Sequence, residues 1–306
     1  MIHLQTKDIN LDKPTAVTIG NFDGLHKGHR RLVENIVGYG GRHGLKSLVL
    51  SFEPHPKEFF GDTEHKHIVT RKEKLQMMER MGVDYFVEYP FDLEFASCSP
   101  YEFLEILLKC GLNAKYITVG ENYKFGKNGE GDVSLLQDFG EKNDIEINIE
   151  RLLYEQGRLV CSTNIKNLIE TGEVYLANWM LGYNFFYQGI VETGRHLGNT
   201  IGFPTANLGD DGYKVIPKIG VYVTNTEVRG QNYLSVTNVG DNPTVNGKRI
   251  TIETNIKGFD ADIYGESIKV QFLQRIRDQR KFASLDELKV QIDKDSEYAR
   301  RWARWV

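Results

Sequence analysis

The chain has 306 residues, with 38 Lys and Arg against 42 Asp and Glu, so its formal net charge is −4. This balance excludes the strongly basic surface of a general nucleic-acid binder and gives no reason to expect attraction to anionic membranes. No run of about 18 uncharged apolar residues occurs, and the first residues lack the basic flank and apolar stretch of an export signal. The length suits two domains, each with its own core.

The three cysteines, Cys98, Cys110 and Cys161, are odd in number, widely spaced and outside any CxxC pattern. This spacing argues against a disulfide framework or a zinc site and predicts reduced thiols. A reducing compartment, the cytoplasm, therefore fits best. Nothing in the sequence indicates an oligomeric state.

Up to about residue 181, short β-branched runs alternate with longer segments of helical period, which predicts a parallel α/β sheet of Rossmann-like type. We expect strands at 16–20, 47–52, 84–89, 116–120 and 145–153. Helices are expected at 28–40, 71–81, 100–110, 133–143 and 162–181. Ligands of such sheets bind beyond the carboxyl ends of the strands.

The most informative stretch follows the first predicted strand and reads Gly20-Asn-Phe-Asp-Gly-Leu-His-Lys-Gly-His29. Its three glycines permit sharp backbone angles and close approach of a ligand, and its two histidines lie three apart at a helix start. Amide groups there attract anions, and imidazoles can donate to phosphate oxygens. The stretch therefore predicts a nucleotide-phosphate site suited to cleavage between the α and β phosphates. The residues expected to form it include Gly20, Asp23, Gly24, His26, Gly28 and His29.

Two further strand ends should meet this turn. Glu53-Pro-His-Pro56 follows the second strand, where two prolines hold His55 in an extended loop, and Gly120-Glu-Asn-Tyr-Lys-Phe-Gly126 follows the fourth. Tyr123 and Phe125 could stack on a planar ring. A simpler interpretation, in which Phe52, Tyr123 and Phe125 are only core residues, stays open.

From about residue 184, glycine-punctuated runs rich in Tyr, Val and Thr predict a small antiparallel β-barrel. Its strands are expected at 187–191, 220–226, 233–239, 250–256 and 268–274. A final helix should run over 284–302, because Ser284-Leu-Asp-Glu287 reads as a capping box. We place the domain boundary between residues 183 and 184.

The barrel half contains a second phosphate-type stretch, Gly194-Arg-His-Leu-Gly-Asn-Thr-Ile-Gly-Phe-Pro-Thr-Ala-Asn-Leu208. Gly198 and Gly202 can make a flexible cover over phosphates, and Pro204 stiffens the exit. Thr205 and Asn207, two apart on an extended segment, point the same way. Their neutral oxygens suit magnesium, although they could also satisfy only the backbone of a turn.

The chain resembles the bacterial bifunctional riboflavin kinase/FAD synthetase family over nearly its whole length. The resemblance rests on residues 20–29, similar to the HxGH signature of nucleotidyltransferases, on 51–56, 119–126 and 161–166, and on 194–208 with its Gly-Phe-Pro-Thr-Ala-Asn ending. It implies an FMN adenylyltransferase in residues 1–183 and a riboflavin kinase in residues 184–306. The substrates would be riboflavin, FMN and ATP, with Mg²⁺, and no nucleic-acid or membrane partner.

The resemblance also implies roles for single residues. His26 and His29 would hold the ATP phosphates and stabilise the departing pyrophosphate, and Glu253 would deprotonate the riboflavin hydroxyl. Further nucleotide contacts would come from Asn21, Asp23, Ser162, Thr163 and Lys166. Flavin contacts would come from Phe52, His55, Asn122, Tyr123, Phe125 and Arg277, and magnesium would be bound by Thr205 and Asn207. From the sequence alone, an isolated strand glutamate such as Glu253 is more often a solvated residue, and Ser162 and Thr163 could merely cap a helix.

Four positions depart from the family pattern. Lys166 replaces an arginine and loses the bidentate fork of a guanidinium; Asn199, Gln279 and Val245 also differ from the usual residues. Lys166, Asn199 and Gln279 leave open the alternative that only one activity, most naturally the adenylyltransferase, is retained. A second alternative, of a different class, is a flavin-binding sensor with vestigial catalysis.

Other features receive structural interpretations. His65 and His67 lie in a charged loop without further Cys or His nearby in the sequence, so we do not expect a metal site there. Trp179, Trp302 and Trp305 are expected to pack or to lie at an interface.

Overall fold

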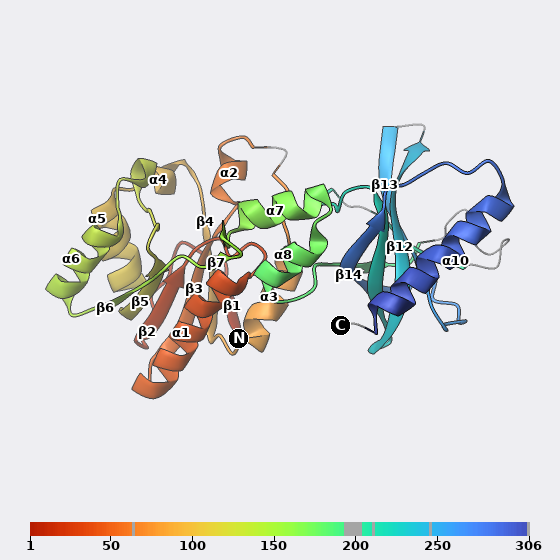
Figure 1. Cartoon of the computed structure of the whole chain (residues 1–306). Helices are drawn as coiled ribbons and strands as arrows, with labels where there is room; N and C mark the ends of the chain where they lie inside the picture. The colour runs from red at the N-terminus through yellow and green to blue at the C-terminus, as the bar shows by residue number, and fades with distance from the viewer. Residues whose placement is uncertain (63–64, 193–203, 210–211, 245–246, 305–306) are drawn as a thin grey trace. The chain divides into compact units, whose positions relative to one another are not determined.

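The computed structural model describes the chain except for residues 63–64, 193–203, 210–211, 245–246 and 305–306 (Figure 1). The chain divides into two compact units, Met1–Ser162 and Thr163–Val306. Each unit is described by itself.

The first unit contains a six-stranded sheet in which every pair of neighbouring strands is parallel. Its strand order is β1-β4-β3-β2-β5-β6. The strands are β1 (Ile2–Leu4), β2 (Thr15–Ile19), β3 (Lys46–Glu53), β4 (Tyr85–Pro90), β5 (Ala114–Gly120) and β6 (Glu146–Glu150). The predicted parallel α/β sheet is confirmed. The sequence analysis missed β1, which is only three residues long.

The sheet connections contain the helices of this unit. They are α1 (Lys27–His43), α2 (Pro56–Phe59), α3 (Arg71–Arg80), α4 (Leu93–Ala96), α5 (Pro100–Glu102), the π-helix η1 (Phe103–Gly111), the 3₁₀ turn η2 (Lys127–Gly129) and α6 (Val133–Asn143). A small hairpin of β7 (Tyr154–Glu155) and β8 (Arg158–Leu159) follows β6. The strand predicted over 145–153 is therefore shorter than expected, because β6 ends at Glu150 and the hairpin begins only at Tyr154.

Alternate strand residues bury two separate cores, one on each face of the sheet. On one face α1 and α3 cover the sheet, with Ile36 and Met78 packed in a cluster that includes Val49. On the other face η1 and α6 do so, with Leu104 and Leu136 in a second cluster. Leu48 and Leu50, which flank Val49 along β3, belong to this second cluster. Burial on both faces explains why these strands read as continuous apolar runs.

Two helices, α7 (Ser162–Thr171) and α8 (Val174–Leu181), stand at the start of the second unit. Ser162, the first residue of α7, is the last residue of the first unit. The single helix predicted over 162–181 is therefore wrong. The chain breaks at Gly172, whose φ of 87° lies in the left-handed region. A Cβ atom at this position would lie 2.5 Å from Cδ of Arg275, so a larger residue would clash as well.

An antiparallel six-stranded barrel follows, with strand order β10-β13-β12-β11-β14-β9. Its strands are β9 (Phe186–Ile190), β10 (Ala206–Gly209), β11 (Gly220–Val228), β12 (Gln231–Thr244), β13 (Gly247–Ile256) and β14 (Ser267–Arg277). A bridge between Glu192 and Asn207 links the two edges, so the barrel is nearly closed. The barrel and C-terminal helix agree with the predicted fold class.

The C-terminal helix α10 (Leu285–Trp302) packs on the barrel, where Trp302 contacts the cluster of Val221, Val223 and Val236, as expected for a packing tryptophan. Ser284 caps the helix by accepting from the Glu287 N–H. The predicted capping box is only half formed, because the Glu287 carboxylate accepts from the backbone of Ala283 instead of Ser284.

The described residues contain no helix that is both long and apolar enough to cross a membrane. All three cysteines are free thiols, as the spacing predicted.

Candidate functional site

The turn after β2 lies where ligands bind in open parallel sheets. β2 lies between β3 and β5 near the middle of the sheet. The chain goes from β2 to β3 on one side and returns later to β5 on the other side, so the strand order reverses at β2. In open parallel sheets such a reversal opens a crevice at the carboxyl ends of the strands. The turn uses left-handed backbone at Phe22, Gly24 and Leu25, with φ values of 52°, 79° and 40°. Phe22 and Leu25 are fully buried, which holds this strained turn in place.

His26 caps α1 rather than lying inside it. Its Nδ1 accepts a hydrogen bond of 3.2 Å from the His29 N–H. In a neutral ring that accepts at Nδ1, the proton sits on Nε2, so the outer nitrogen is a donor. The His29 ring stacks on the His26 ring at 3.6 Å between centroids. The two histidines therefore share one side of the helix start, as their spacing predicted.

Burial keeps both rings neutral at pH 7. It lowers the pKa of His26 from 6.5 to about 4, although the nearby Asp23 carboxylate acts in the opposite direction. Burial, with added repulsion from His26 and Lys74, holds the pKa of His29 well below 6.5. A neutral imidazole keeps one N–H group, and beside the helix amides this group can donate to a phosphate oxygen.

Lys74 is a residue that the sequence analysis missed. It comes from α3, and its Nζ donates to the Asn21 carbonyl at 3.1 Å. Burial lowers its pKa, whereas the carboxylates of Asp23, Glu88 and Glu53 raise it. The one sequence signal was its spacing, since Lys74 lies four residues before the buried Met78 and so on the inward face of α3.

Asp23 ties the turn to two distant segments. Its Oδ1 accepts from the Ile68 N–H at 2.9 Å, and its carbonyl accepts from the Ser162 hydroxyl at 2.8 Å. Ser162 thus lies against the turn. Thr163 and Lys166 belong to the second unit.

Several buried polar atoms near the carboxyl ends of β2 and β3 have no hydrogen-bond partner among the described residues. They are Thr18 Oγ1, Asn21 Oδ1, His29 Nδ1 and Ser51 Oγ. Buried polar atoms usually have partners, and their concentration at one place is typical of a site that a polar ligand completes.

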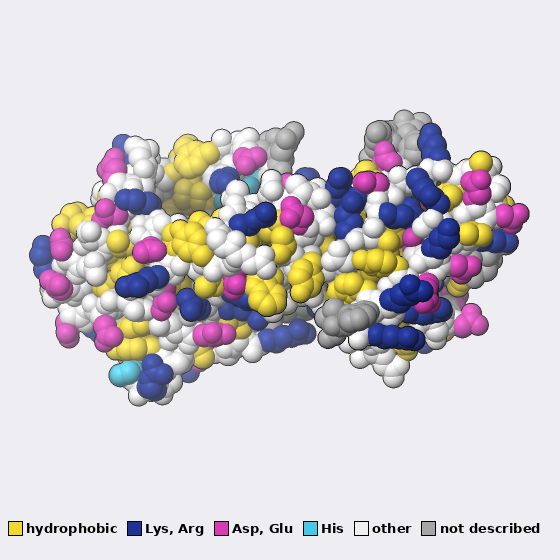
Figure 2. Space-filling view, viewed as in Figure 1, with side chains coloured by type: hydrophobic (Ala, Val, Ile, Leu, Met, Phe, Trp, Pro, Cys, Tyr) yellow, Lys and Arg dark blue, Asp and Glu magenta, His cyan; other side chains and the backbone are white. Residues whose placement is uncertain are grey.

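A cavity of about 540 Å³ lies beside the turn, and side chains from all three predicted strand ends line it. Figure 2 shows hydrophobic side chains gathered in a hollow between α2 and α4. The lining includes Gly20, Asn21, Phe52, Pro56, Phe91, Phe95, Asn122, Tyr123, Phe125 and Gly126. Tyr123 and Phe125 are nearly parallel, with 5.7 Å between ring centroids. The geometry suits an aromatic ring system.

His55 does not line this cavity. It caps the short helix α2 by accepting from the Lys57 N–H, and its ring stacks on His65 at 4.4 Å. His65 and His67 have no further Cys or His near them in the sequence, but the fold brings His55 and Asp23 to them.

In the barrel, Asn207 on β10 and Glu253 on β13 lie directly opposite each other, and Asn238 on β12 is the next residue in the same cross-strand row. The flanking Ile252 and Thr254 are buried, so Glu253 and Asn207 share the outer face. Their side chains therefore meet on one surface.

Thr205 lines a cavity of about 580 Å³ together with Pro204, Thr254 and Phe259. The Asn255 side chain donates to the Pro204 carbonyl at 2.7 Å and holds the start of β10. Gly198 and Gly202, together with Asn199 and Val245, lie outside the described residues.

Arg277 forms an ion pair with Asp295 of α10, at 2.7 Å between Nη2 and Oδ2. Asp295 is only 3% exposed. The guanidinium thus fastens α10 to the end of β14, and its predicted flavin contact stays a prediction.

Comparison with known proteins also finds two successive families along the chain. The FAD synthetase family profile matches residues 8–164, and the riboflavin kinase family profile matches residues 181–303. The bifunctional riboflavin kinase/FMN adenylyltransferase of Bacillus subtilis is 36% identical over 293 residues, with 94% of this chain and 92% of that protein covered. Its counterpart in Escherichia coli K12 is 38% identical over 289 residues, with the same coverage.

Among solved structures, one described as a macrolide-efflux protein from Streptococcus pneumoniae superposes with a TM-score of 0.91 and 34% identity. The match covers 99% of this chain and 100% of that one. Since both halves match in order and the relatives align over almost their full length, this chain belongs to the bifunctional riboflavin kinase/FMN adenylyltransferase family.

Proposed function

We propose that the chain phosphorylates riboflavin to FMN in the barrel and then transfers AMP from ATP to FMN beside the turn after β2. The adenylyltransferase would occupy residues 1–183 and the kinase residues 184–306. The observation that carries the proposal is the stacked pair of neutral histidines at the start of α1, beside a cavity with aromatic walls. Both reactions consume ATP, which fits the cytoplasm that the reduced thiols suggest.

In the adenylyl transfer, a phosphate oxygen of FMN attacks the α phosphorus of ATP, and the bond to the bridging oxygen breaks to release pyrophosphate. The attacking oxygen is already anionic, so alignment and charge stabilisation matter more than a base. The Nε2–H of His26, the imidazole of His29 and the amides of α1 would bind the phosphates, and Lys74 would supply a positive charge. Phe52, Tyr123 and Phe125 would hold the flavin ring, with Asn122 at the cavity mouth.

In the kinase reaction, the terminal hydroxyl of riboflavin attacks the γ phosphorus of ATP and ADP leaves. Glu253 would take the hydroxyl proton. Asn207 lies opposite it on the same face, two residues after Thr205. These oxygen donors fit magnesium, which would neutralise charge on the ATP phosphates when bound.

Incubation of the purified chain with riboflavin, ATP and magnesium, followed by chromatographic separation of flavins, tests the proposal. FMN and then FAD should accumulate. A protein with only the adenylyltransferase would make FAD from added FMN but not from riboflavin, and a sensor would bind flavin without forming either product.

A further inference from the structure

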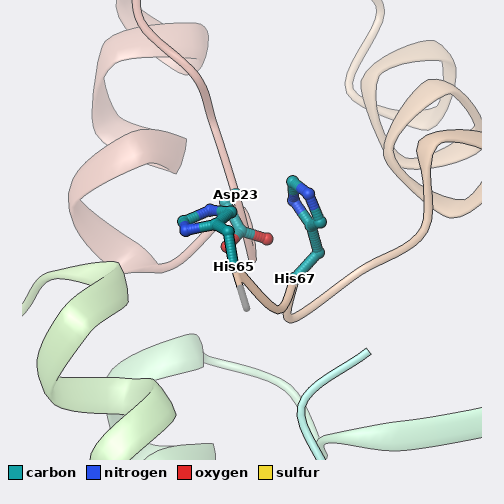
Figure 3. Close-up of side chains that lie close together, drawn as sticks. All are labelled: Asp23, His65 and His67. Atoms are coloured by element: carbon teal, nitrogen blue, oxygen red, sulfur yellow. The ribbon is translucent and has the colours of Figure 1, made fainter. Parts of the chain in front are cut away.

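Beside the phosphate turn, three side chains from two separate segments converge. Asp23 comes from the turn after β2, and His65 and His67 come from the connection between α2 and α3. One ligand-type atom from each lies within 4.8 Å of the other two. Figure 3 shows the Asp23 carboxylate between the two imidazole rings. His67 is 5% exposed and Asp23 is 4% exposed.

The backbone holds this arrangement in place. The Ile68 N–H donates to Asp23 Oδ1 at 2.9 Å, which fastens the segment that carries both histidines to the turn. His65 and His67 are two residues apart in a non-helical segment, and this spacing directs both side chains to the same side. The three groups are therefore positioned without any bound ion.

Carboxylates surround the histidines from outside. His67 Nε2 lies 2.6 Å from Glu58 Oε1, and His65 Nδ1 lies 3.6 Å from Asp62 Oδ2. Histidines that bind metals usually give their second ring nitrogen to a carboxylate, which fixes the ring and raises its basicity. Here each ring has one nitrogen facing such a carboxylate.

The charges around the cluster favour a dication. Asp23, Glu58 and Asp62 contribute three carboxylates, against the positive charge of Lys74, which also acts on Asp23. Two imidazole nitrogens and one carboxylate oxygen form a donor set typical of zinc and neighbouring transition metals, whereas magnesium prefers oxygen donors throughout.

We infer that Asp23, His65 and His67 bind one divalent transition-metal ion of the zinc class, with a remaining coordination position open. The ion joins the phosphate turn to the segment before α3. This site is separate from the magnesium that the barrel residues fit, and its existence does not depend on the proposed reactions.

Cobalt binding to untagged protein stripped of metal by a chelator tests the inference directly. Because Co²⁺ bound by nitrogen and oxygen in a low-coordinate site absorbs visible light strongly, it serves as the probe, in the absence of nucleotide. The expected result is one Co²⁺ per chain, displaced by Zn²⁺ and not by excess Mg²⁺. No saturable cobalt spectrum, or displacement by Mg²⁺, would overturn the inference.

Variants show whether these residues are the ligands. His65→Gln and His67→Gln should each weaken cobalt binding by at least about 10-fold, and Glu58→Gln by about 10- to 100-fold. His43→Gln removes an exposed histidine elsewhere on α1 and should leave binding unchanged. Circular dichroism verifies folding; if one variant misfolds, the other two decide. Wild-type affinity in the folded histidine variants would contradict the assignment.

Discussion

The imidazole of His29 stacks on that of His26 with 16° between the ring planes, while the His29 backbone donates to the His26 side chain. His26 is thus both the helix cap and half of the proposed phosphate-binding pair. If the proposal holds, this dual use couples the start of α1 to the chemistry, because the ring that would bind phosphate also accepts from the amide of His29, one of the amides in the first turn that lack a partner within the helix.

His29→Ala should abolish FAD formation while FMN still accumulates. The substitution removes one imidazole from the proposed phosphate site but leaves the cap at His26, so α1 should stay folded. Loss of one preorganised donor corresponds to a decrease of about 100-fold or more in kcat for adenylylation. Flavin chromatography with riboflavin as substrate measures both products at once. Loss of FMN formation in a folded variant would contradict the division into two sites.

Lys74→Met should slow adenylylation by about 10-fold or more without changing the kinase rate, since it removes the partly buried positive charge beside the turn. Lys72→Met is the matched control, because Lys72 is exposed on the same helix. The assay supplies FMN for the first activity and riboflavin for the second. Equal effects of the two substitutions would remove Lys74 from the proposed site.

The fold was largely predictable because its signals are local. Short hydrophobic runs predict the strands β2, β3 and β5. The glycines that follow β2 predict a sharp turn, and the helix begins within a few residues of them. Lys74 and the partners of His65 were not predictable, because their roles depend on packing between segments about 40 to 50 residues apart. Hydrophobic periodicity places a residue on a face but does not say which loop lies against that face.

The break at Gly172 shows the same limit. One glycine inside a helical pattern is tolerated at modest cost, so the pattern over 162–181 favoured a continuous helix. The Arg275 side chain of β14, about 100 residues later, lies so close to Gly172 that a Cβ atom would not fit there, so the structure requires glycine at the break for a reason that the local pattern does not contain.

Stability should fall as the pH drops below 6.5, and His26 should account for part of the decline. Its pKa is about 4 in the folded chain against an ordinary 6.5. Between these pH values the unfolded state binds a proton at His26 that the folded state does not. The free energy of unfolding therefore falls as the pH decreases from 6.5 towards 4. At about 1.4 kcal/mol for each unit of pKa, the loss is about 3 kcal/mol.

Urea unfolding followed by circular dichroism from pH 7 to pH 4 measures this decline. His26→Asn keeps an N-cap acceptor and should show a shallower pH dependence. All three tryptophans lie in the second unit, so tryptophan fluorescence gives an internal control that the substitution should not change. An unchanged slope by dichroism would show that His26 is not the titrating group.

Glu253→Gln should abolish FMN formation and leave FAD formation from added FMN intact. The amide keeps the size of the side chain but cannot accept the hydroxyl proton, so kcat for the kinase should fall by about 100- to 10,000-fold. Glu227→Gln on β11 is a control for loss of one carboxylate from a barrel strand. If Glu253→Gln retained kinase activity, the base would have to be sought elsewhere on the barrel.

Asp295→Ala should destabilise the barrel, because it leaves the half-buried Arg277 guanidinium without the carboxylate that now faces it. We expect a loss of about 2 kcal/mol in the free energy of unfolding, less than for a fully buried pair since Arg277 is partly exposed. Asp293→Ala, at an exposed position of the same helix, should change stability by less than about 0.5 kcal/mol. Tryptophan fluorescence during urea unfolding reports this unit. A parallel measurement of the KM for riboflavin, without urea and at a temperature where the variant is fully folded, separates the two roles of Arg277. If Arg277 only fastens α10, Asp295→Ala lowers stability and leaves KM unchanged. A rise in KM would support the predicted flavin contact.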